Sequence, residues 1–350
     1  MDNRGLTDKL EAERALAKEE WTQLIGTFTD GDREYAREKA QRAAQGRFGN
    51  GVFFRGIVEF TNFCKNDCLY CGIRRSDREI ARYRLTKEEI LACCRGGYAA
   101  GFRTFVLQGG EDPFYDDERM TDIVSSIRAE FPDCAITLSI GEKPRESYQK
   151  FFDAGANRYL LRHETANEEH YRKLHPPAQS FAERMRCLRD LRDIGYQTGC
   201  DMMVGSPYQS VETLAEDMMF MCGFGPQMIG LGPFIPHHGT PFRDFPAGST
   251  ETTLMLLSLC RLMLPDVLLP ATTALGTVSA DGRKLGVLAG ANVIMPNLSP
   301  PADREKYMLY DNKAITGDDA AESLQVLQGH LDSIGYRLVS ARGDYREAGI

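Results

Sequence analysis

Three cysteines stand close together in one short stretch of the sequence. Cys64, Cys68 and Cys71 fall within residues 59–75, EFTNFCKNDCLYCGIRR, behind a β-branched and aromatic run. A disulfide needs two thiols, and a closed tetrahedral zinc site needs four ligands. A cubane 4Fe–4S cluster has four iron corners, so three thiolates leave one iron open. An open iron can chelate a small ligand, such as the amino and carboxylate groups of an amino acid.

Two other kinds of centre remain open for these thiols. Thiolates also select zinc, but a structural zinc site would need a further Cys or His close by, and the next histidine is His163. A cluster that only transfers electrons would favour four thiolates. The spacing C-x3-C-x2-C therefore favours an iron–sulfur cluster with one open iron.

The thiols follow the first of eight predicted strands, which alternate with helices. Residues 52–60 predict a strand, and Thr86 with Glu89 three residues on predicts a capping box that begins a helix over 86–101. Strands that alternate with helices form a parallel sheet, and eight such units close a TIM-type (β/α)8 barrel. The other predicted strands are 104–110, 135–141, 158–165, 197–205, 227–234, 268–275 and 291–297, and the other predicted helices are 121–131, 146–155, 181–195, 211–223, 251–264 and a weaker segment at 281–290.

The barrel prediction divides the chain into three regions. Residues 1–50 are expected to form an N-terminal helical extension with helices over 6–27 and 32–50, residues 51–312 the barrel, and residues 313–350 a C-terminal helical tail. An open, doubly wound sheet is the alternative. In a barrel the chemistry lies at the carboxyl ends of the strands, where the cysteine loop would lie.

Composition and charge exclude several classes of protein. The 350 residues are 42% hydrophobic and 26% charged, with a formal net charge of −8, which argues against nucleic-acid binding. The charged N-terminus predicts no signal peptide. The most apolar stretch is interrupted by Arg261, Asp266 and two prolines, so no membrane span is expected. We expect a cytoplasmic monomer.

The remaining cysteines are expected to be reduced core residues. Ten cysteines in a long chain without a secretion signal do not predict a disulfide scaffold. Free cysteine is among the most buried residue types. The cysteines that fall in predicted helices or at element ends are Cys93, Cys94, Cys134, Cys187, Cys222 and Cys260.

The cysteine motif, with Tyr70 before its last cysteine, resembles the signature of the radical S-adenosylmethionine (SAM) superfamily. The resemblance implies that the open iron chelates the methionyl part of SAM. One electron from the cluster then breaks a sulfur–carbon bond and yields a 5′-deoxyadenosyl radical. Gly109, Gly110 and Glu111 match the family's Gly-Gly-Glu segment, which meets the SAM amino group.

Several further stretches resemble one family of the superfamily. VLQGGEDPFY, RYLLRHETAN, IGLGPFIPH, PATTALGT and GANVIMPN, with the cysteine loop, resemble the HydE family, the radical SAM maturases of the FeFe-hydrogenase H-cluster. The resemblance extends from about residue 50 to 312. It implies that the adenosyl radical attacks the cysteine sulfur of a small iron complex bearing carbon monoxide and cyanide. Other hydrogenase maturases and an electron donor are the implied partners.

The same resemblance implies two sets of contact residues. Residues two apart on a strand share a face, so Thr137 can act with Ser139, and Arg162 with Glu164. Taken alone, a salt bridge between Arg162 and Glu164 and a solvated Arg184 remain open, as does core packing for the methionines. The residues implied to hold SAM are Thr137, Ser139, Glu164 and Arg184, and those implied to face the substrate are Arg55, Gln108, Arg162, Met228, Thr272, Thr273, Met295 and Tyr307.

Some features depart from the family pattern, and they leave alternative functions open. No cysteine follows Cys260, so the second cluster of some members is expected to be absent. Biotin synthase needs several cysteines on inward strand faces, and only Cys200 lies inside a predicted strand. A methylornithine-synthase-like mutase remains open, as does a carrier that binds a cluster or zinc without chemistry. His237 and His238 suggest metal ligands, although a loop histidine pair is expected at the surface.

Overall fold

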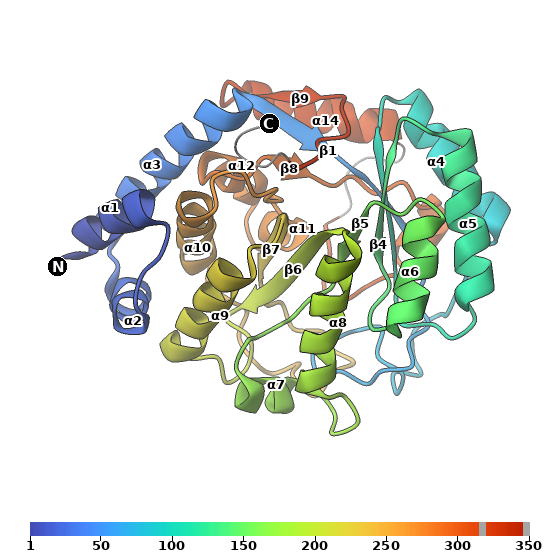
Figure 1. Cartoon of the computed structure of the whole chain (residues 1–350), viewed down its shortest axis with the longest axis horizontal. Helices are drawn as coiled ribbons and strands as arrows, with labels where there is room; N and C mark the ends of the chain where they lie inside the picture. The colour runs from blue at the N-terminus through green and yellow to red at the C-terminus, as the bar shows by residue number, and fades with distance from the viewer. Residues whose placement is uncertain (315–319, 346–350) are drawn as a thin grey trace.

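The computed structural model describes residues 1–314 and 320–345, and its chain begins with three helices outside the barrel (Figure 1). These are α1 (Asn3–Glu13), α2 (Lys18–Thr27) and α3 (Asp30–Phe48). The single helix predicted over 6–27 is wrong, because Arg14 adopts a left-handed conformation with φ 63° and ends α1. The break lets α1 pack on α10 (Thr250–Met263) while α2 packs on α9 (Val211–Phe224).

Six parallel strands form the continuous part of the barrel wall. They pair in the order β2-β3-β4-β5-β6-β7, so each strand lies beside the next one in the sequence. Each is connected to the next through a helix, as the alternating pattern predicted. The strands are β2 (Gly56–Thr61), β3 (Thr104–Gly109), β4 (Ala135–Ser139), β5 (Arg158–Leu160), β6 (Gln197–Val204) and β7 (Met228–Pro233).

Single bridges and a second small sheet close this wall into a ring. Strand β8 (Val293–Ile294) lies between the stretch at 268–270 and β1 (Gly51–Phe54), which leads into β2. The predicted eight-stranded barrel is thus confirmed. The strand predicted over 268–275 is shorter than expected, since Thr272 already caps α11 (Thr273–Val278). The bridges are Met228 with Leu268, Pro270 with Val293, and Ile57 with Asn297.

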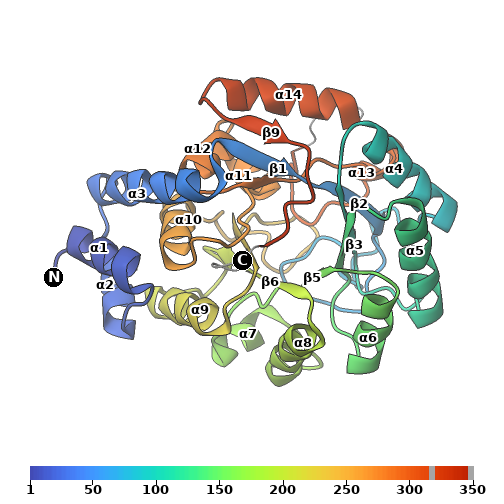
Figure 2. The same cartoon turned by 45° about the horizontal axis from the view of Figure 1, so that its top comes forward.

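The predicted strand over 52–60 is two strands that change partner at Arg55. Strand β2 pairs with β3, whereas β1 pairs with β8 and with β9 (Arg337–Val339). Strand β9 was not predicted: the expected helical tail contains α14 (Ala320–Asp332) and then this strand, which lies beside β1 at one end of the molecule (Figure 2). The parts of that tail at 315–319 and 346–350 lie outside the described residues.

Helices surround the ring (Figure 2). The predicted capping box is confirmed: the Thr86 hydroxyl accepts from the Glu89 N–H, and the Glu89 carboxylate accepts from the Thr86 N–H. Three short helices, α7, α11 and α13, were not predicted. The remaining helices are α4 (Lys87–Ala99), α5 (Asp117–Glu130), α6 (Arg145–Asp153), α7 (Glu168–Leu174), α8 (Phe181–Ile194), α12 (Gly282–Leu288) and α13 (Pro301–Arg304).

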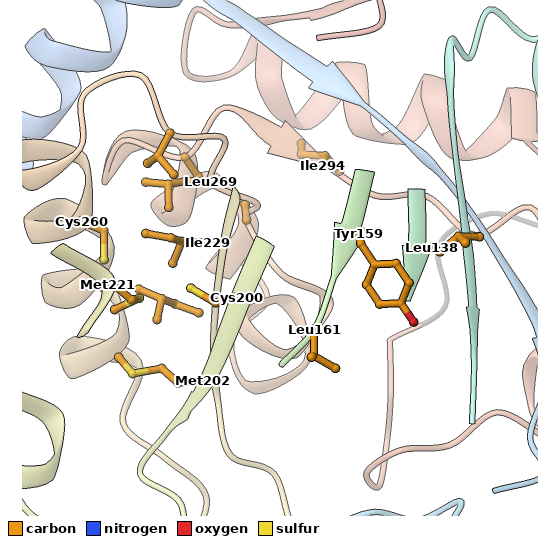
Figure 3. Packing of buried hydrophobic residues seen from close by; sticks show 14 of the residues in the cluster. Leu138, Tyr159, Leu161, Cys200, Met202, Met221, Ile229, Cys260, Leu269 and Ile294 are labelled. Carbon is orange, nitrogen blue, oxygen red and sulfur yellow. The ribbon is translucent and has the colours of Figure 1, made fainter. Parts of the chain in front are cut away.

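The main core lies between the barrel wall and its helices. Figure 3 shows Cys200 of β6 and Cys260 of α10 in this layer with Met221 of α9 and Ile229 of β7, and all four are fully buried. All ten cysteines are free, and of the six expected in the core, Cys93 and Cys222 are only partly buried. Among the residues that the structure describes, no helix is both long and apolar enough to cross a membrane.

The C-terminal segment fills the amino-terminal end of the barrel. Arg158, at the start of β5, is fully buried and donates to the carbonyls of Arg342 and Gly343 at 2.8 and 3.0 Å, and to Asp344 Oδ1 at 2.7 Å. The Thr104 hydroxyl, at the start of β3, donates to the Arg342 carbonyl at 2.9 Å. This end is therefore closed, and the opposite end carries the cysteine loop.

Candidate active site

The three predicted thiols converge on one cavity at the carboxyl end of β2. The loop folds back on itself, since the Cys71 N–H donates to the Cys68 carbonyl at 3.4 Å and the Arg75 N–H donates to the Asn66 carbonyl at 2.8 Å. The cavity has a volume of about 280 Å³ and is lined by Cys64, Cys68 and Cys71. The loop therefore brings the three thiols together at one cavity, as expected for ligands of a single metal centre.

The surroundings of the thiols disfavour negative charge in the absence of a cation. Burial, and next the charge of Cys64, raise the pKa of Cys71 to about 12. Burial, Cys71 and Cys64 together raise the pKa of Cys68 well above its usual value. Thiolates crowded in this way need a positive centre to stabilise them, and a metal centre supplies that charge. The three side chains thus fit a thiolate-bound metal cluster.

Glycines allow the next segment to approach the thiols closely. A Cβ on Gly110 would lie 2.2 Å from the Phe63 carbonyl oxygen and 2.8 Å from Cys64 Cβ. Gly141 has φ +78°, and a Cβ there would lie 2.1 Å from Glu111 Cγ. Glu111 is buried beside the thiols, and among the described residues its ion pair is with Lys65, with Nζ 3.2 Å from Oε2. The Gly-Gly-Glu segment thus presents a carboxylate at the cavity wall.

The end of β4 adds a hydroxyl pair to the same wall. Thr137 and Ser139, two residues apart, both line the cavity, as their shared strand face predicted. The Thr137 hydroxyl is buried and has no hydrogen-bond partner within the described ranges 1–314 and 320–345. A buried polar atom without a partner is unfavourable, so this hydroxyl is suited to a ligand.

Glu164 lies beyond β5 in a conformation that is uncommon for a residue other than glycine. Its φ is 64°, and the side chain is buried. The Tyr70 hydroxyl lies 3.0 Å from Glu164 Oε1 and 3.1 Å from His175 Nε2. Glu164 Oε2 is buried and has no hydrogen-bond partner in the described part of the chain. Burial raises the pKa of Glu164, although Arg162 opposes that effect.

Two arginines predicted for this site have carboxylate partners that the sequence did not reveal. Arg162 does not form the ion pair with Glu164 that remained open; its Nε lies 3.7 Å from Asp201 Oδ2. Arg184 is buried on α8 rather than solvated, with its Nε 2.5 Å from Glu142 Oε1. Both guanidinium groups are thereby fixed at the cavity wall.

The deeper part of the cavity is lined by the residues predicted to face a substrate. Arg55 Nη1 lies 3.2 Å from Met228 Sδ, and Arg55 Nη2 donates to the Gly343 carbonyl at 3.4 Å. Burial, and then the charge of Arg158, lower the pKa of Arg55 well below its usual value. The others that line the cavity are Gln108, Arg162, Thr272, Thr273, Met295 and Tyr307, with Gln108 hydrogen-bonded to the Tyr307 hydroxyl.

Sequence reasoning missed several residues that support the site. Asp201 on β6 pairs with Arg162, and Gln179 accepts from the Cys68 thiol at 3.2 Å. His175 ends α7 and contacts Tyr70. The residues at 168–179 carried no element prediction, so nothing indicated that they return to the cysteine loop.

The histidine pair after β7 is only partly at the surface. The side chain of His238 is 68% exposed, with its Nδ1 2.7 Å from Asp311 Oδ1, but His237 is buried, contrary to the expectation. His237 Nδ1 accepts from the Gly239 N–H at 3.0 Å. Neither histidine lines the cavity.

Comparisons with known proteins agree with this geometry. Residues 58–221 match the Radical SAM superfamily. Together with three thiols that follow the first strand of a (β/α)8 barrel, this match defines a radical SAM enzyme.

Relatives refine this class. The "[FeFe] hydrogenase maturase subunit HydE" of Thermotoga maritima is 43% identical over 313 residues, which is 89% of each chain. The chain therefore belongs to the HydE family of radical SAM enzymes. The 3-methylornithine synthase of Methanosarcina barkeri is 32% identical over 88% of this chain and 87% of its own.

Solved structures share the fold. The crystal structure of methylornithine synthase (PylB) has a TM-score of 0.83 at 29% identity, over 95% of this chain and 97% of that one. HydG, described as a maturase of the [FeFe]-hydrogenase, has a TM-score of 0.80 at 20% identity, over 99% of this chain and 77% of that one. At this identity, the similarity to HydG shows only that the two chains share a fold.

Proposed function

We propose that this protein acts in assembly of the FeFe-hydrogenase H-cluster by cleaving SAM at one 4Fe–4S cluster held by Cys64, Cys68 and Cys71. The observation that carries the proposal is the convergence of these thiols, the Gly-Gly-Glu segment and Glu164 on one cavity. The identity of 43% to HydE, over 89% of each chain, supports the maturase role. Residues 51–312 form the catalytic unit in this proposal.

The side chains around the thiols suit a zwitterionic nucleoside. When bound, the cluster and SAM together supply a 5′-deoxyadenosyl radical by one-electron cleavage of a sulfur–carbon bond. Glu111, beside Gly109 and Gly110, holds the SAM amino group, and Arg184 places positive charge near its carboxylate. Thr137 Oγ1 and Glu164 Oε2, which have no hydrogen-bond partner among the described residues, are available with Ser139 to the hydroxyls of the nucleoside. Tyr70 keeps Glu164 in place through its 3.0 Å contact.

The deeper compartment suits a small anion with soft ligands. Arg55 and Arg162 supply guanidinium charge, Thr272 and Thr273 supply hydroxyls, and methionine side chains supply a polarizable surface. A cysteine-bound iron complex that carries carbon monoxide and cyanide has this character, and we propose it as the substrate. The closed amino-terminal end of the barrel keeps bulk water away from the reacting atoms.

The proposed activity depends on other proteins. It requires an electron donor to reduce the cluster, and it places the protein beside the other hydrogenase maturases. We further propose that it works as a cytoplasmic monomer that binds neither nucleic acid nor a membrane, consistent with its net charge of −8.

A mutase related to 3-methylornithine synthase is the second candidate. Identity of 32% to the 3-methylornithine synthase of Methanosarcina barkeri, and a TM-score of 0.83 at 29% identity to the solved PylB structure, favour it specifically. Both candidates need the thiols and SAM, so only the substrate separates them.

The test is anaerobic reconstitution with iron and sulfide, followed by reduction in the presence of SAM. We expect about four iron atoms per chain and release of 5′-deoxyadenosine. Cys68→Ala abolishes the release, whereas Cys222→Ala, a partly exposed cysteine outside the cavity, leaves it unchanged. Adenosylation of the iron–cysteine complex identifies the maturase, and formation of 3-methylornithine identifies the mutase.

A carrier without chemistry predicts a different result. Zinc in place of iron, with no 5′-deoxyadenosine from the wild-type protein, would contradict both enzymatic candidates. Release of 5′-deoxyadenosine by Cys68→Ala at the wild-type rate would contradict the role given to the thiols.

A further inference from the structure

The backbone at Glu164 requires support from outside its own segment. A positive φ is uncommon for residues with a Cβ and persists only where the surroundings hold it. Glu164 adopts φ 64° just beyond the short strand β5, and its N–H donates to the Asp201 carbonyl at 2.9 Å. This bond, part of a bridge between Glu164 and Met202, fixes the start of the turn and leaves the residues on either side to be held by other groups.

Asp217 of α9 contacts the chain on both sides of Glu164. Its Oδ1 accepts a hydrogen bond from the Ala166 N–H, two residues after Glu164, and lies 3.4 Å from Nε2 of His163, the residue before Glu164. The side chains of Asp217 and His163 are fully buried. The His163 ring also packs on Phe220, with ring centroids 4.9 Å apart. One carboxylate thus spans the turn that carries Glu164.

Asp217 occupies a position where the helix otherwise buries apolar side chains. Leu214, Met218 and Met221 of α9 are its buried neighbours on the helix. A buried carboxylate is unfavourable unless its partners compensate, so a carboxylate on this face indicates a role in contacts beyond the helix. The adjacent Glu216 supports the same turn, because its Oε2 accepts from Asn167 Nδ2 at 2.7 Å.

We propose that Asp217 is a positioning residue for the cofactor site: by spanning the turn from His163 to Ala166, it keeps the Glu164 carboxylate directed into the cavity. The inference rests on the proposed binding of SAM. Asp217 itself is absent from the cavity lining, so its effect on SAM passes through Glu164.

The test is a double-mutant cycle on the full-length, cluster-reconstituted protein. The SAM dissociation constant is measured by equilibrium dialysis with the cluster oxidised, so the readout does not depend on turnover. The variants are Asp217→Leu, Glu164→Ala and the double variant. We expect Asp217→Leu to raise the dissociation constant about tenfold, and to change it less than about twofold once Glu164 is alanine. In Asp217→Leu, the KM for SAM should rise together with the dissociation constant, and kcat should change less.

Conservative and matched variants distinguish a loss of Glu164 positioning from a general loss of stability. Asp217→Asn keeps an oxygen that accepts from the Ala166 N–H, so it should restore most of the affinity. Met221→Ala removes a fully buried side chain from the same helix face and should leave the dissociation constant unchanged. His163→Phe keeps the ring against Phe220, removes the contact with Asp217, and should weaken SAM in the same direction.

Each outcome decides the inference. An equal loss of affinity from Asp217→Leu with and without Glu164 would overturn it, as would unchanged affinity in the single variant. If Asp217→Leu does not fold, the cycle of His163→Phe with Glu164→Ala replaces it, and additivity there overturns the inference equally. A wild-type protein with an intact cluster that binds no SAM would instead contradict the proposed function.

Discussion

At the scale of single residues, the surroundings of the cysteine-loop thiols favour the protonated form, whereas a metal is bound by the thiolate. Burial, and next the charge of Cys64, raise the pKa of Cys71 to about 12, above the ordinary value of 9.0. A raised pKa means that the folded chain binds the Cys71 proton more tightly than the unfolded chain does. Below about pH 9 both states keep this proton, and the stabilising contribution is fully present. That contribution is lost as the pH rises from about 9 towards 12.

The cluster-free protein is therefore expected to lose stability in mild alkali because of Cys71. Between about pH 8 and 10 its free energy of unfolding should fall by about 1 kcal/mol more than that of Cys71→Ala, since only the wild-type chain carries this thiol. Urea unfolding of both proteins without metal measures the difference. Parallel pH profiles for the two proteins would show that burial of Cys71 has no such effect.

The residues of the site were predictable to different degrees. The cysteines and the Gly-Gly-Glu segment form contiguous motifs, and the structure brings all of them to one cavity. Asp201 and His175 were not predictable, because their partners Arg162 and Tyr70 are distant in the sequence. Pairing across a barrel depends on strand register and on short helices, which periodicity alone does not give.

At the scale of elements, the loop after β4 shows how a backbone shape makes room for a side chain. Gly141 adopts φ +78° and leaves the space that Glu111 occupies from the neighbouring loop. An L side chain at this position would be strained and would also meet Glu111, so both the turn and the carboxylate depend on the missing Cβ.

Gly141→Ala is accordingly expected to harm both stability and cofactor binding. The free energy of unfolding should fall by about 1–3 kcal/mol, and SAM should bind more weakly because Glu111 is displaced. The matched control is Gly46→Ala in the last turn of α3, where a Cβ would meet nothing within 4 Å. That control should gain up to about 1 kcal/mol from the higher helix propensity of alanine. Equal effects at the two positions, measured by urea unfolding, would contradict this account.

The elements themselves were largely predictable from apolar periodicity and capping residues. The helix capped by Thr86 and Glu89 begins where the capping box placed it. The helix predicted over 6–27 failed because its two halves pack on different partners, and helical propensity does not record that choice. Strand β9 is three residues long and is fixed by pairing with β1, so the local sequence carried little signal for it.

At the scale of the whole molecule, the C-terminal segment and the barrel stabilise each other through a buried charge. Arg158 is fully buried, and Asp344, 34% exposed, supplies its carboxylate partner at 2.7 Å. Although burial opposes the effect, hydrogen bonds from Arg342 and the nearby charge of Arg158 lower the pKa of Asp344 to about 2. The contribution of Asp344 is therefore present above its ordinary pKa of 3.8 and is lost as the pH falls towards 2.

Asp344→Asn should weaken this closure. Removal of one partner of a buried ion pair costs about 3–5 kcal/mol, but the partial exposure of Asp344 reduces the expected loss to about 1–2 kcal/mol at neutral pH. The difference from wild type should shrink between about pH 4 and 2, where wild-type Asp344 takes up its proton. Asp244→Asn, at an 89% exposed carboxylate paired with Arg243, is the control and should match wild type. A wild-type free energy of unfolding in Asp344→Asn at neutral pH would show that the closure does not depend on this charge.

The same closure makes the two ends of the polypeptide unequal as places to attach a label. Met1 is 74% exposed and precedes a helix outside the barrel, so a fluorophore or affinity handle there lies away from the catalytic chamber. Gly343, near the other end, touches Arg55, whose guanidinium lines that chamber. Because the segment at 342–345 closes the barrel beneath that chamber, the activity of carboxyl-tagged protein should be compared with that of amino-tagged protein.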